Sequence, residues 1–279
     1  PDPLLRASAR WGEARILYAE KRYNETFTSI QALINEYPDS PHLAQAYFLQ
    51  GFVHYRLENY SAAADSWQTY LVLRPGYLDA YVQELRGDAL YSAKDYPAAL
   101  AAYTAAIQSP ALGDDIAVDL KVASTHTQMG NYDSALALYD GITARAPNDY
   151  IKAQAGYESG LVYQAQGQNE AALEKFRFAV ENYPLSYYSY LSLVALLDAG
   201  GTVSELDRGL VDFFAGQYAV AIAAFDRYLA SNPADNDGTV YYYRAQSRRN
   251  LSFYDEALQD YETFIANYSA HPNCGDAWG

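Results

Sequence analysis

The chain repeats itself about every 36 residues, and this period constrains its fold more than any other feature. A small residue returns at steps of 37, 36, 36, 37, 49 and 36 residues, at Ala14, Gly51, Gly87, Ala123, Gly160, Gly209 and Ala245. A fixed period of about 20–50 residues is typical of repeat architectures, in which each unit buries its apolar face only against its neighbours. The period therefore predicts a solenoid rather than a single globular core.

Further landmarks keep the same phase. Twelve residues after each small residue stands a second one, and four residues further on a larger one. The second small residues are Thr26, Ala63, Ala99, Ala135, Ala172, Ala221 and Ala257; the larger ones are Ile30, Trp67, Tyr103, Tyr139, Phe176, Phe225 and Tyr261. A proline ends most units, at Pro38, Pro75, Pro110, Pro147, Pro184 and Pro233.

These landmarks predict that each unit is a hairpin of two helices. Antiparallel helices approach closely only where side chains are small, so we expect Gly51 to face Ala63, with Trp67 filling the space beside them. Proline ends the second helix and sets the turn into the next unit. Tyrosines at the turns are interpreted as packing residues, and they account for part of the 29 tyrosines in the chain: Tyr23, Tyr60, Tyr96, Tyr132, Tyr218 and Tyr254.

The pattern resembles the tetratricopeptide (TPR) repeat family over about residues 7–272, although its units are longer than the usual ~34 residues. The resemblance implies an all-α fold, a right-handed TPR-like superhelix of about seven helix-turn-helix repeats with one inserted helix. The expected segments are residues 1–184 (repeats one to five), 185–201 (inserted helix), 202–272 (repeats six and seven) and 273–279 (truncated start of a further repeat). We accordingly expect the chain to be a fragment of a longer protein.

Two shorter stretches resemble bacterial envelope proteins. Residues 181–188, ENYPLSYY, are similar to a stretch in the superhelical, non-catalytic region of soluble lytic murein transglycosylases. Residues 23–60 resemble the TPR units of outer-membrane assembly lipoproteins and cell-division coordinators. These resemblances imply an extracytoplasmic bacterial protein, periplasmic or at the cell surface, whose signal or anchor has been removed. A cytoplasmic location is the alternative.

Charge and composition exclude several classes of function. The net charge is −15 and the 19 Lys and Arg residues are scattered, whereas phosphate binding needs clustered cations, so nucleic acid is not expected as a partner. The longest apolar run, residues 191–197, is far shorter than the ~18–20 residues of a membrane span. The single cysteine, Cys274, can form neither an internal disulfide nor a cysteine-based metal cluster. We expect no metal and no cofactor.

No catalytic residue is predicted either. Transglycosylases use a Glu followed by Ser, and Glu158-Ser159 matches that pair, but it lies inside ordinary repeat sequence and is interpreted as a coincidence. Phosphate-loop, nucleophile-elbow and dinucleotide motifs are missing from the sequence. The chain itself is therefore predicted not to be an enzyme, while the resemblance implies that a longer parent protein could be a lytic transglycosylase.

The family usually binds its ligands on the concave face lined by first helices. Projecting the period onto that face selects a candidate binding set rich in aromatic residues: Trp11, Arg15, Tyr18, Phe48, Phe52, Tyr55, Tyr81, Tyr91, Tyr157, Phe213, Phe214, Tyr242 and Arg249. The partner would be a protein or peptide, with peptidoglycan or an attached catalytic domain as alternatives. The expected function is a non-catalytic scaffold of a cell-envelope protein; the alternative is a free-standing TPR adaptor.

The same residues also have a purely structural interpretation, in which they contact the next repeat. Phe213 and Phe214 are the expected exceptions, because two adjacent rings on one helix should not both point into the same core.

Overall fold

A computed structural model describes residues 2–109, 115–231 and 236–278. Over these ranges the chain is helical, with fifteen α-helices, two short 3₁₀ helices and no strand. Within the two compact units, twelve of these helices pack in sequence-adjacent pairs as six hairpins, and the all-helical architecture confirms the predicted all-α solenoid. The closing prolines predicted at Pro110 and Pro233 lie outside the described residues.

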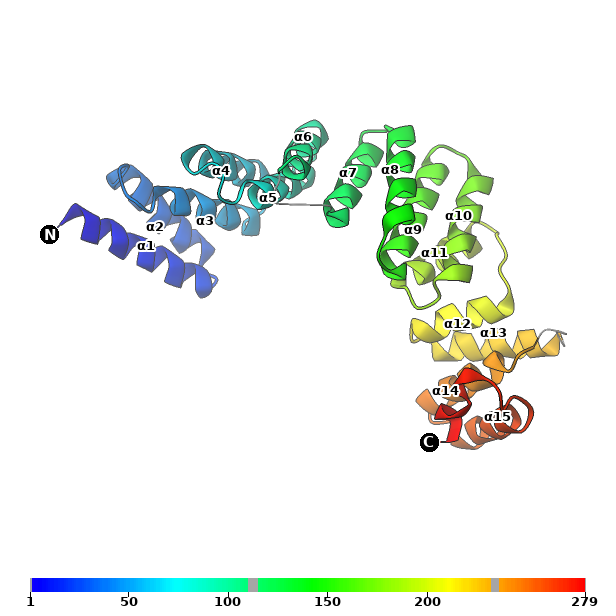
Figure 1. Cartoon of the computed structure of the whole chain (residues 1–279). Coiled ribbons are helices and arrows are strands. Elements are labelled where there is room, and N and C mark those ends of the chain that lie inside the picture. The colour runs from blue at the N-terminus through cyan, green and yellow to red at the C-terminus, as the bar shows by residue number, and fades with distance from the viewer. Residues whose placement is uncertain (1, 110–114, 232–235, 279) are drawn as a thin grey trace. The chain divides into compact units, whose positions relative to one another are not determined.

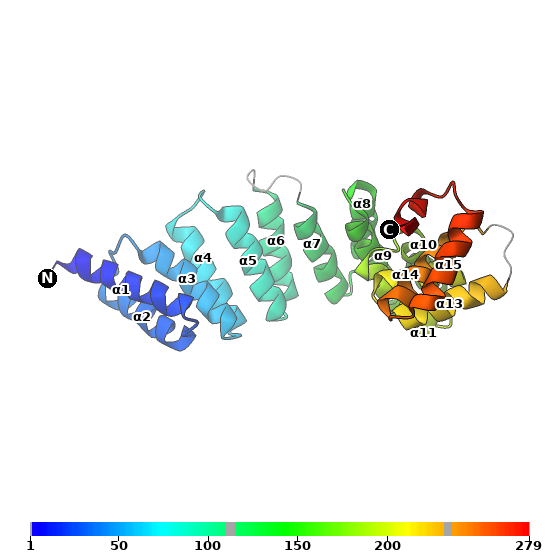
Figure 2. The ribbon, with the colours of Figure 1, turned by 90° about the horizontal axis from the view of Figure 1, so that it is seen from below.

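The chain divides into two compact units, Pro1–Ala135 and Leu136–Gly279. In the first unit consecutive helices run antiparallel and stack side by side (Figures 1 and 2). The helices are α1 (Pro3–Ala19), α2 (Tyr23–Glu36), α3 (Leu43–Arg56), α4 (Tyr60–Leu73), α5 (Asp79–Ser92), α6 (Tyr96–Ile107), α7 (Ile116–Gln128) and the start of α8 (Tyr132–Arg145).

The second unit contains three complete hairpins, the end of α8 and the inserted helix. Its elements are α9 (Asp149–Ala165), α10 (Asn169–Asn182), α11 (Tyr187–Asp198), α12 (Glu205–Phe214), α13 (Tyr218–Ala230), α14 (Thr239–Asn250), α15 (Tyr254–Asn267), η1 (Pro272–Cys274) and η2 (Asp276–Trp278). Helix α11 packs on α9 and α10 but contacts α12 far less than the two helices of a hairpin contact each other. It is the extra helix expected between repeats five and six.

The repeated spacing between small and large residues along the chain has a direct steric cause in four hairpins. A Cβ added to Gly51 would lie 2.3 Å from the ring of Trp67, and one added to Gly160 would lie 2.3 Å from Phe176. Gly87 with Tyr103 and Gly209 with Phe225 repeat the arrangement. The ring of Trp67 thus lies directly against the glycine. That Gly51 also faces Ala63 stays a prediction.

The turn inside each hairpin also has one backbone form, although its sequence varies. The second residue after the first helix has positive φ in all seven of these turns; glycine fills three of the positions, and Lys21, Glu58, Lys94 and Ser252 fill the others with φ of 60–65°. Non-glycine residues are disfavoured there. Backbone hydrogen bonds close the turn, as where Asn59 N–H donates to the carbonyl oxygen of His54 at 2.9 Å, and side-chain packing adds to them. The turn tyrosine supplies such packing, because its ring lies 5.3–5.8 Å from an aromatic ring on the first helix in the pairs Tyr18–Tyr23, Tyr55–Tyr60, Tyr91–Tyr96 and Phe213–Tyr218.

Candidate functional site

Five of the thirteen predicted binding residues line one groove in the first unit. The groove has a volume of about 430 Å³ and lies between side chains of α1 and α3. Its lining consists of Trp11, Arg15, Tyr18, Gln45, Phe48, Leu49 and Phe52. Sequence reasoning missed Gln45 and Leu49, which lie one helical turn from residues that it selected.

The aromatic wall of this groove is held from behind by α4. Phe48 and Phe52 contact each other edge to face at 5.1 Å. Phe48 also lies 5.1 Å from the ring of Tyr70, and Phe52 lies 5.3 Å from Trp67, both of which are buried. A wall supported in this way is preorganised, which reduces the entropy lost on binding.

Two polar groups stand among the rings. Arg15 is exposed, and within the described part of the chain it makes no ion pair or hydrogen bond. The side-chain carbonyl oxygen of Gln45 is buried without a hydrogen-bond partner among the described residues. The groove therefore offers a free cationic donor and an unsatisfied acceptor beside an apolar wall, the combination typical of ligand sites.

The corresponding surface two repeats later, between α5 and α7, carries an ion-paired lysine that the sequence analysis did not place there. Lys121 on α7 donates to Glu84 at 2.7 Å and to Asp88 at 2.8 Å, both on α5. Burial opposes the charge on Lys121, but these hydrogen bonds raise its pKa above the usual value. Tyr103 also donates to Asp88, at 2.8 Å. Lys121 lies about one period after these acids, so the register itself could have revealed the pairing.

The remaining candidates in the first unit do not join the groove. Tyr55 is half-buried against Tyr60 and lies 6.1 Å from Trp67. The Tyr91 hydroxyl lies 3.0 Å from that of Ser124. Tyr81 is exposed on α5.

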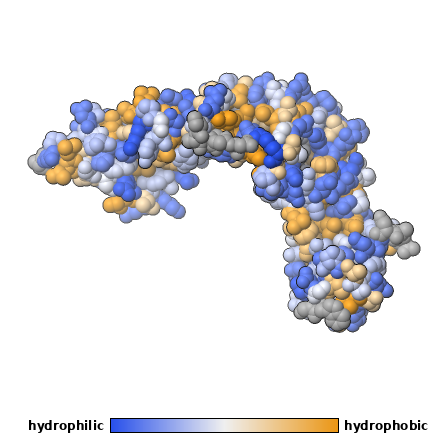
Figure 3. All heavy atoms as spheres, in the orientation of Figure 1, coloured by the Kyte–Doolittle hydropathy of each residue, from blue (hydrophilic) through white to orange (hydrophobic). Residues whose placement is uncertain are grey.

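In the second unit several candidates pack against neighbouring helices. Phe213 and Phe214 are half-buried and lie 5.0 Å and 5.4 Å from the ring of Tyr243, so both rings pack on the next hairpin. Apolar residues gather on the surface over α12 (Figure 3). Tyr242 is only 8% exposed and packs on Phe264, so it is unavailable to a partner in this conformation. Arg249 is exposed at the end of α14.

Comparison with known families agrees with this geometry. Family models described as "Tetratricopeptide repeat" match residues 43–114, 90–157 and 157–205, which together span more than half of the chain. The chain is a tetratricopeptide repeat protein. No curated protein sequence matches it at a significant level.

Solved structures share the fold of this TPR protein at low identity. The C-terminal part of a TPR repeat-containing protein from Cytophaga hutchinsonii gives a TM-score of 0.52 at 18% identity, covering 96% of this chain and 98% of its own. MamA gives 0.52 at 18% identity, covering 63% and 90%. YrrB, described as a TPR protein with an unusual peptide-binding site, gives 0.51 at 22% identity, covering 65% and 87%.

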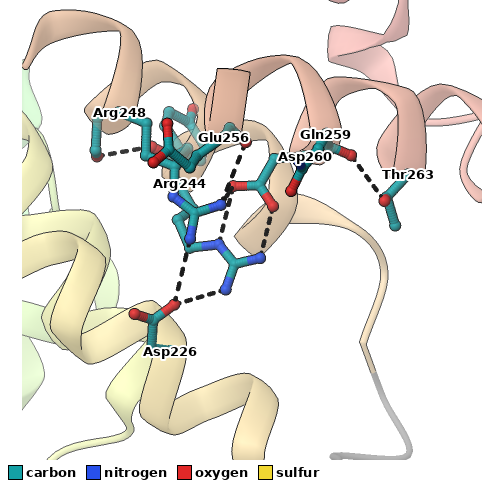
Figure 4. Close-up of polar contacts among 9 residues, drawn as sticks. Asp226, Arg244, Arg248, Glu256, Gln259, Asp260 and Thr263 are labelled. Atoms are coloured by element: carbon teal, nitrogen blue, oxygen red, sulfur yellow. Dashed lines mark hydrogen bonds and ion pairs between the residues drawn. The ribbon is translucent and has the colours of Figure 1, made fainter. Parts of the chain in front are cut away.

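A charged network joins the last two hairpins of this TPR protein (Figure 4). Arg244 on α14 donates to both carboxylate oxygens of Asp260 on α15, at 2.9 Å and 2.5 Å, and to Asp226 on α13 at 2.6 Å. Arg248 donates to Asp260 at 2.6 Å. The side chains of Asp260 and Arg244 are 4% and 13% exposed, so this network is a structural clamp rather than a binding surface.

Asp212 on α12 is a second buried carboxylate, but it is poorly paired. Its Oδ2 atom has no hydrogen-bond partner among the described residues, and the nearest cation, Arg208 Nε, is 3.8 Å away. Burial raises the pKa of Asp212 from 3.8 to about 6, although the charges of Arg208 and Arg227 act in the opposite direction. The folded protein therefore binds a proton at a pH where the unfolded chain does not.

Replacing Asp212 with asparagine is expected to stabilise the protein near neutral pH. Because the folded-state pKa is raised, the carboxylate destabilises the fold above about pH 6, and this penalty fades as the pH falls toward 4. We expect Asp212→Asn to raise the free energy of unfolding by about 1–3 kcal/mol at about pH 7.5. At about pH 5 the difference between the variant and the unaltered chain should be smaller by about 1 kcal/mol.

Urea unfolding at the two pH values measures this difference. The exposed Asp198 on neighbouring α11 provides the matched control, since Asp198→Asn makes the same change of charge. If the difference in free energy of unfolding between Asp212→Asn and the unaltered chain were the same at both pH values, the raised pKa of Asp212 would be contradicted.

The described residues contain no group of three or more His, Cys, Asp or Glu side chains that could hold a metal ion. Among the described helices, none is both long and apolar enough to cross a membrane.

The Ser159 hydroxyl donates to the carbonyl oxygen of Ala155 at 2.8 Å and is buried, as in an ordinary helix. His54 lies edge-on to Phe27 at 5.0 Å, and burial lowers its pKa.

Proposed function

We propose that this TPR protein is a scaffold that binds a polypeptide segment in the groove between α1 and α3. The observation that carries the proposal is the set of aromatic rings, one free arginine and one unsatisfied amide oxygen around a volume of about 430 Å³. A large apolar side chain of the partner fits against Phe48 and Phe52, where aromatic anchors give most of the binding energy in peptide interfaces.

The two polar groups suit the backbone of such a segment. Arg15 can donate to a carbonyl or carboxylate oxygen of the partner, whereas Gln45 Oε1 can accept from a backbone N–H group. A buried acceptor without a partner is unfavourable, so a ligand that supplies the missing donor gains free energy there.

The transglycosylase and envelope predictions remain proposals that depend on residues 181–188 and 23–60 alone. The matching family models describe the repeat and not an attached enzyme. Aromatic rings also stack on sugars, so peptidoglycan is the alternative occupant of the groove. An extracytoplasmic bacterial location would suit either occupant.

A displayed library of short random peptides, selected against the whole chain, tests the proposed function. We expect the selected peptides to share an aromatic or large aliphatic residue and to change the tryptophan fluorescence of the chain, to which Trp11 contributes together with two other tryptophans. Phe48→Ala should weaken their binding about tenfold or more, and Arg15→Ala should weaken it less.

Tyr81→Ala is the matched control, because it removes an exposed ring outside the groove. Circular dichroism checks that each variant is folded. Equal binding by Phe48→Ala and the unaltered chain would refute the groove as the site. Retention on insoluble peptidoglycan, lost in Phe48→Ala while no peptide is selected, would reassign the groove to sugars.

A further inference from the structure

A cluster of tyrosines lies in the second unit, away from the groove described above. Tyr188 on α11 is at its centre, with its ring 5.2 Å from Tyr150, 6.0 Å from Tyr157 and 6.2 Å from Tyr187. Tyr150 and Tyr157 come from α9, so the cluster exists only because the inserted helix packs on α9. Tyr150 and Tyr187 form an open rim, with 51% and 60% of each residue exposed.

An unpaired carboxylate belongs to this cluster. Glu158 follows Tyr157 on α9 and is half-buried, and it forms no ion pair or hydrogen bond within the described ranges. Burial raises the pKa of Glu158 above its usual value. The charge of Glu158 in turn contributes to the raised pKa values of Tyr157 and of Tyr188, the latter about 12, so it acts on the phenol groups of both.

The nearest cation in sequence is already engaged elsewhere. Lys152 on α9 lies 3.5 Å from Asp149, and its ammonium group lies 5.9 Å from the centre of the Tyr183 ring. The negative charge of Glu158 is therefore left without a counter-ion in the described structure. A half-buried carboxylate is unfavourable in that state, and a cation brought by a partner would relieve it.

We propose that Tyr150, Tyr187, Tyr188 and Glu158 form a site for the lysine or arginine side chain of a basic polypeptide segment. Tyrosine rings attract a cation through their negative faces, and a nearby carboxylate adds an ion pair. Packing alone would explain rings that are fully buried, but the rim of this cluster is open to solvent. The net charge of −15 also favours the approach of a basic partner. The site is independent of the groove in the first unit.

Binding of a short peptide of alternating glycine and lysine, measured by calorimetry at physiological salt, tests the proposal. The glutamate counterpart of the peptide should not bind. We expect Glu158→Gln to weaken binding of the lysine peptide about tenfold, and Tyr187→Leu to weaken it several-fold. Glu158→Gln should not lower the melting temperature, because it removes a carboxylate that has no partner.

Glu174→Gln is the matched control, since it removes the same charge from an exposed position on α10. If Glu158→Gln and Glu174→Gln weaken binding equally, the attraction is only that of the net charge and the proposed site is wrong. Retention on insoluble peptidoglycan that depends on Tyr187 but not on Glu158 would assign the rings to sugar stacking instead, and would also overturn the proposal.

Discussion

Replacing Gly51 with alanine is expected to lower the free energy of unfolding by about 2–3 kcal/mol, because the added methyl group would lie 2.3 Å from the ring of Trp67. Trp67 cannot move aside easily, since it is buried and its indole N–H donates to the carbonyl oxygen of Phe48 at 3.2 Å. Urea unfolding followed by circular dichroism measures the loss. Phe48 and Phe52 pack near this ring, so the variant should also weaken peptide binding in the groove.

Gly12→Ala is the control for this substitution. Gly12 lies inside α1, and a Cβ built there meets no atom within 4 Å. Alanine is the better helix former, so Gly12→Ala should raise the free energy of unfolding by about 0.5–1 kcal/mol. If Gly51→Ala were also stabilising, the close approach of Trp67 to the glycine would be refuted.

Replacing Asp260 with asparagine is expected to lower the free energy of unfolding by about 3–5 kcal/mol. The change leaves Arg244 and Arg248, which are mostly buried, without the carboxylate that both of them contact. The cost of burying the two guanidinium groups would then no longer be offset by the negative charge of Asp260. Urea unfolding of the variant, read from the far-ultraviolet circular dichroism signal, gives the value.

Asp226 provides the control within the same network. It contacts Arg244 at 2.6 Å, but its side chain is 51% exposed. Exposed ion pairs contribute little, so Asp226→Asn should lower the free energy of unfolding by less than about 1 kcal/mol. Similar losses for the two variants would show that the network is screened by water and is not a buried clamp.

The periodic landmarks were sufficient to predict most of the fold, because each reports a contact inside one hairpin. Gly51 and Trp67 are close in sequence and in space, and the turn tyrosines contact rings only five residues before them. The step of 49 residues likewise predicted the inserted helix, observed as α11. The right-handed sense of the superhelix and the segment boundaries at 184 and 201 remain predictions.

The binding surface was predicted less well, because it depends on contacts between successive repeats. Trp11, Arg15 and Phe48 do meet in one groove. The ion pairs of Lys121 with Glu84 and Asp88 join α5 and α7 of two successive repeats, and a selection of aromatic positions did not include them. The burial of Tyr242 depends instead on Phe264 within the same hairpin, which the spacing alone did not reveal. The tyrosine cluster beside Glu158 likewise depends on the packing of α11 on α9.

The small interface between α11 and α12 has a consequence for local unfolding of the second unit. In a stack of repeats, stability is approximately the sum of the hairpins and the interfaces between neighbours. An interface with little packing is the place where such a stack parts first. A fluctuation there exposes the side chains that α11 and α12 bury against each other, while the hairpins before and after the interface stay intact. The extra helix α11 thus gives the array a preferred place to separate, in addition to the tyrosine cluster that it forms with α9.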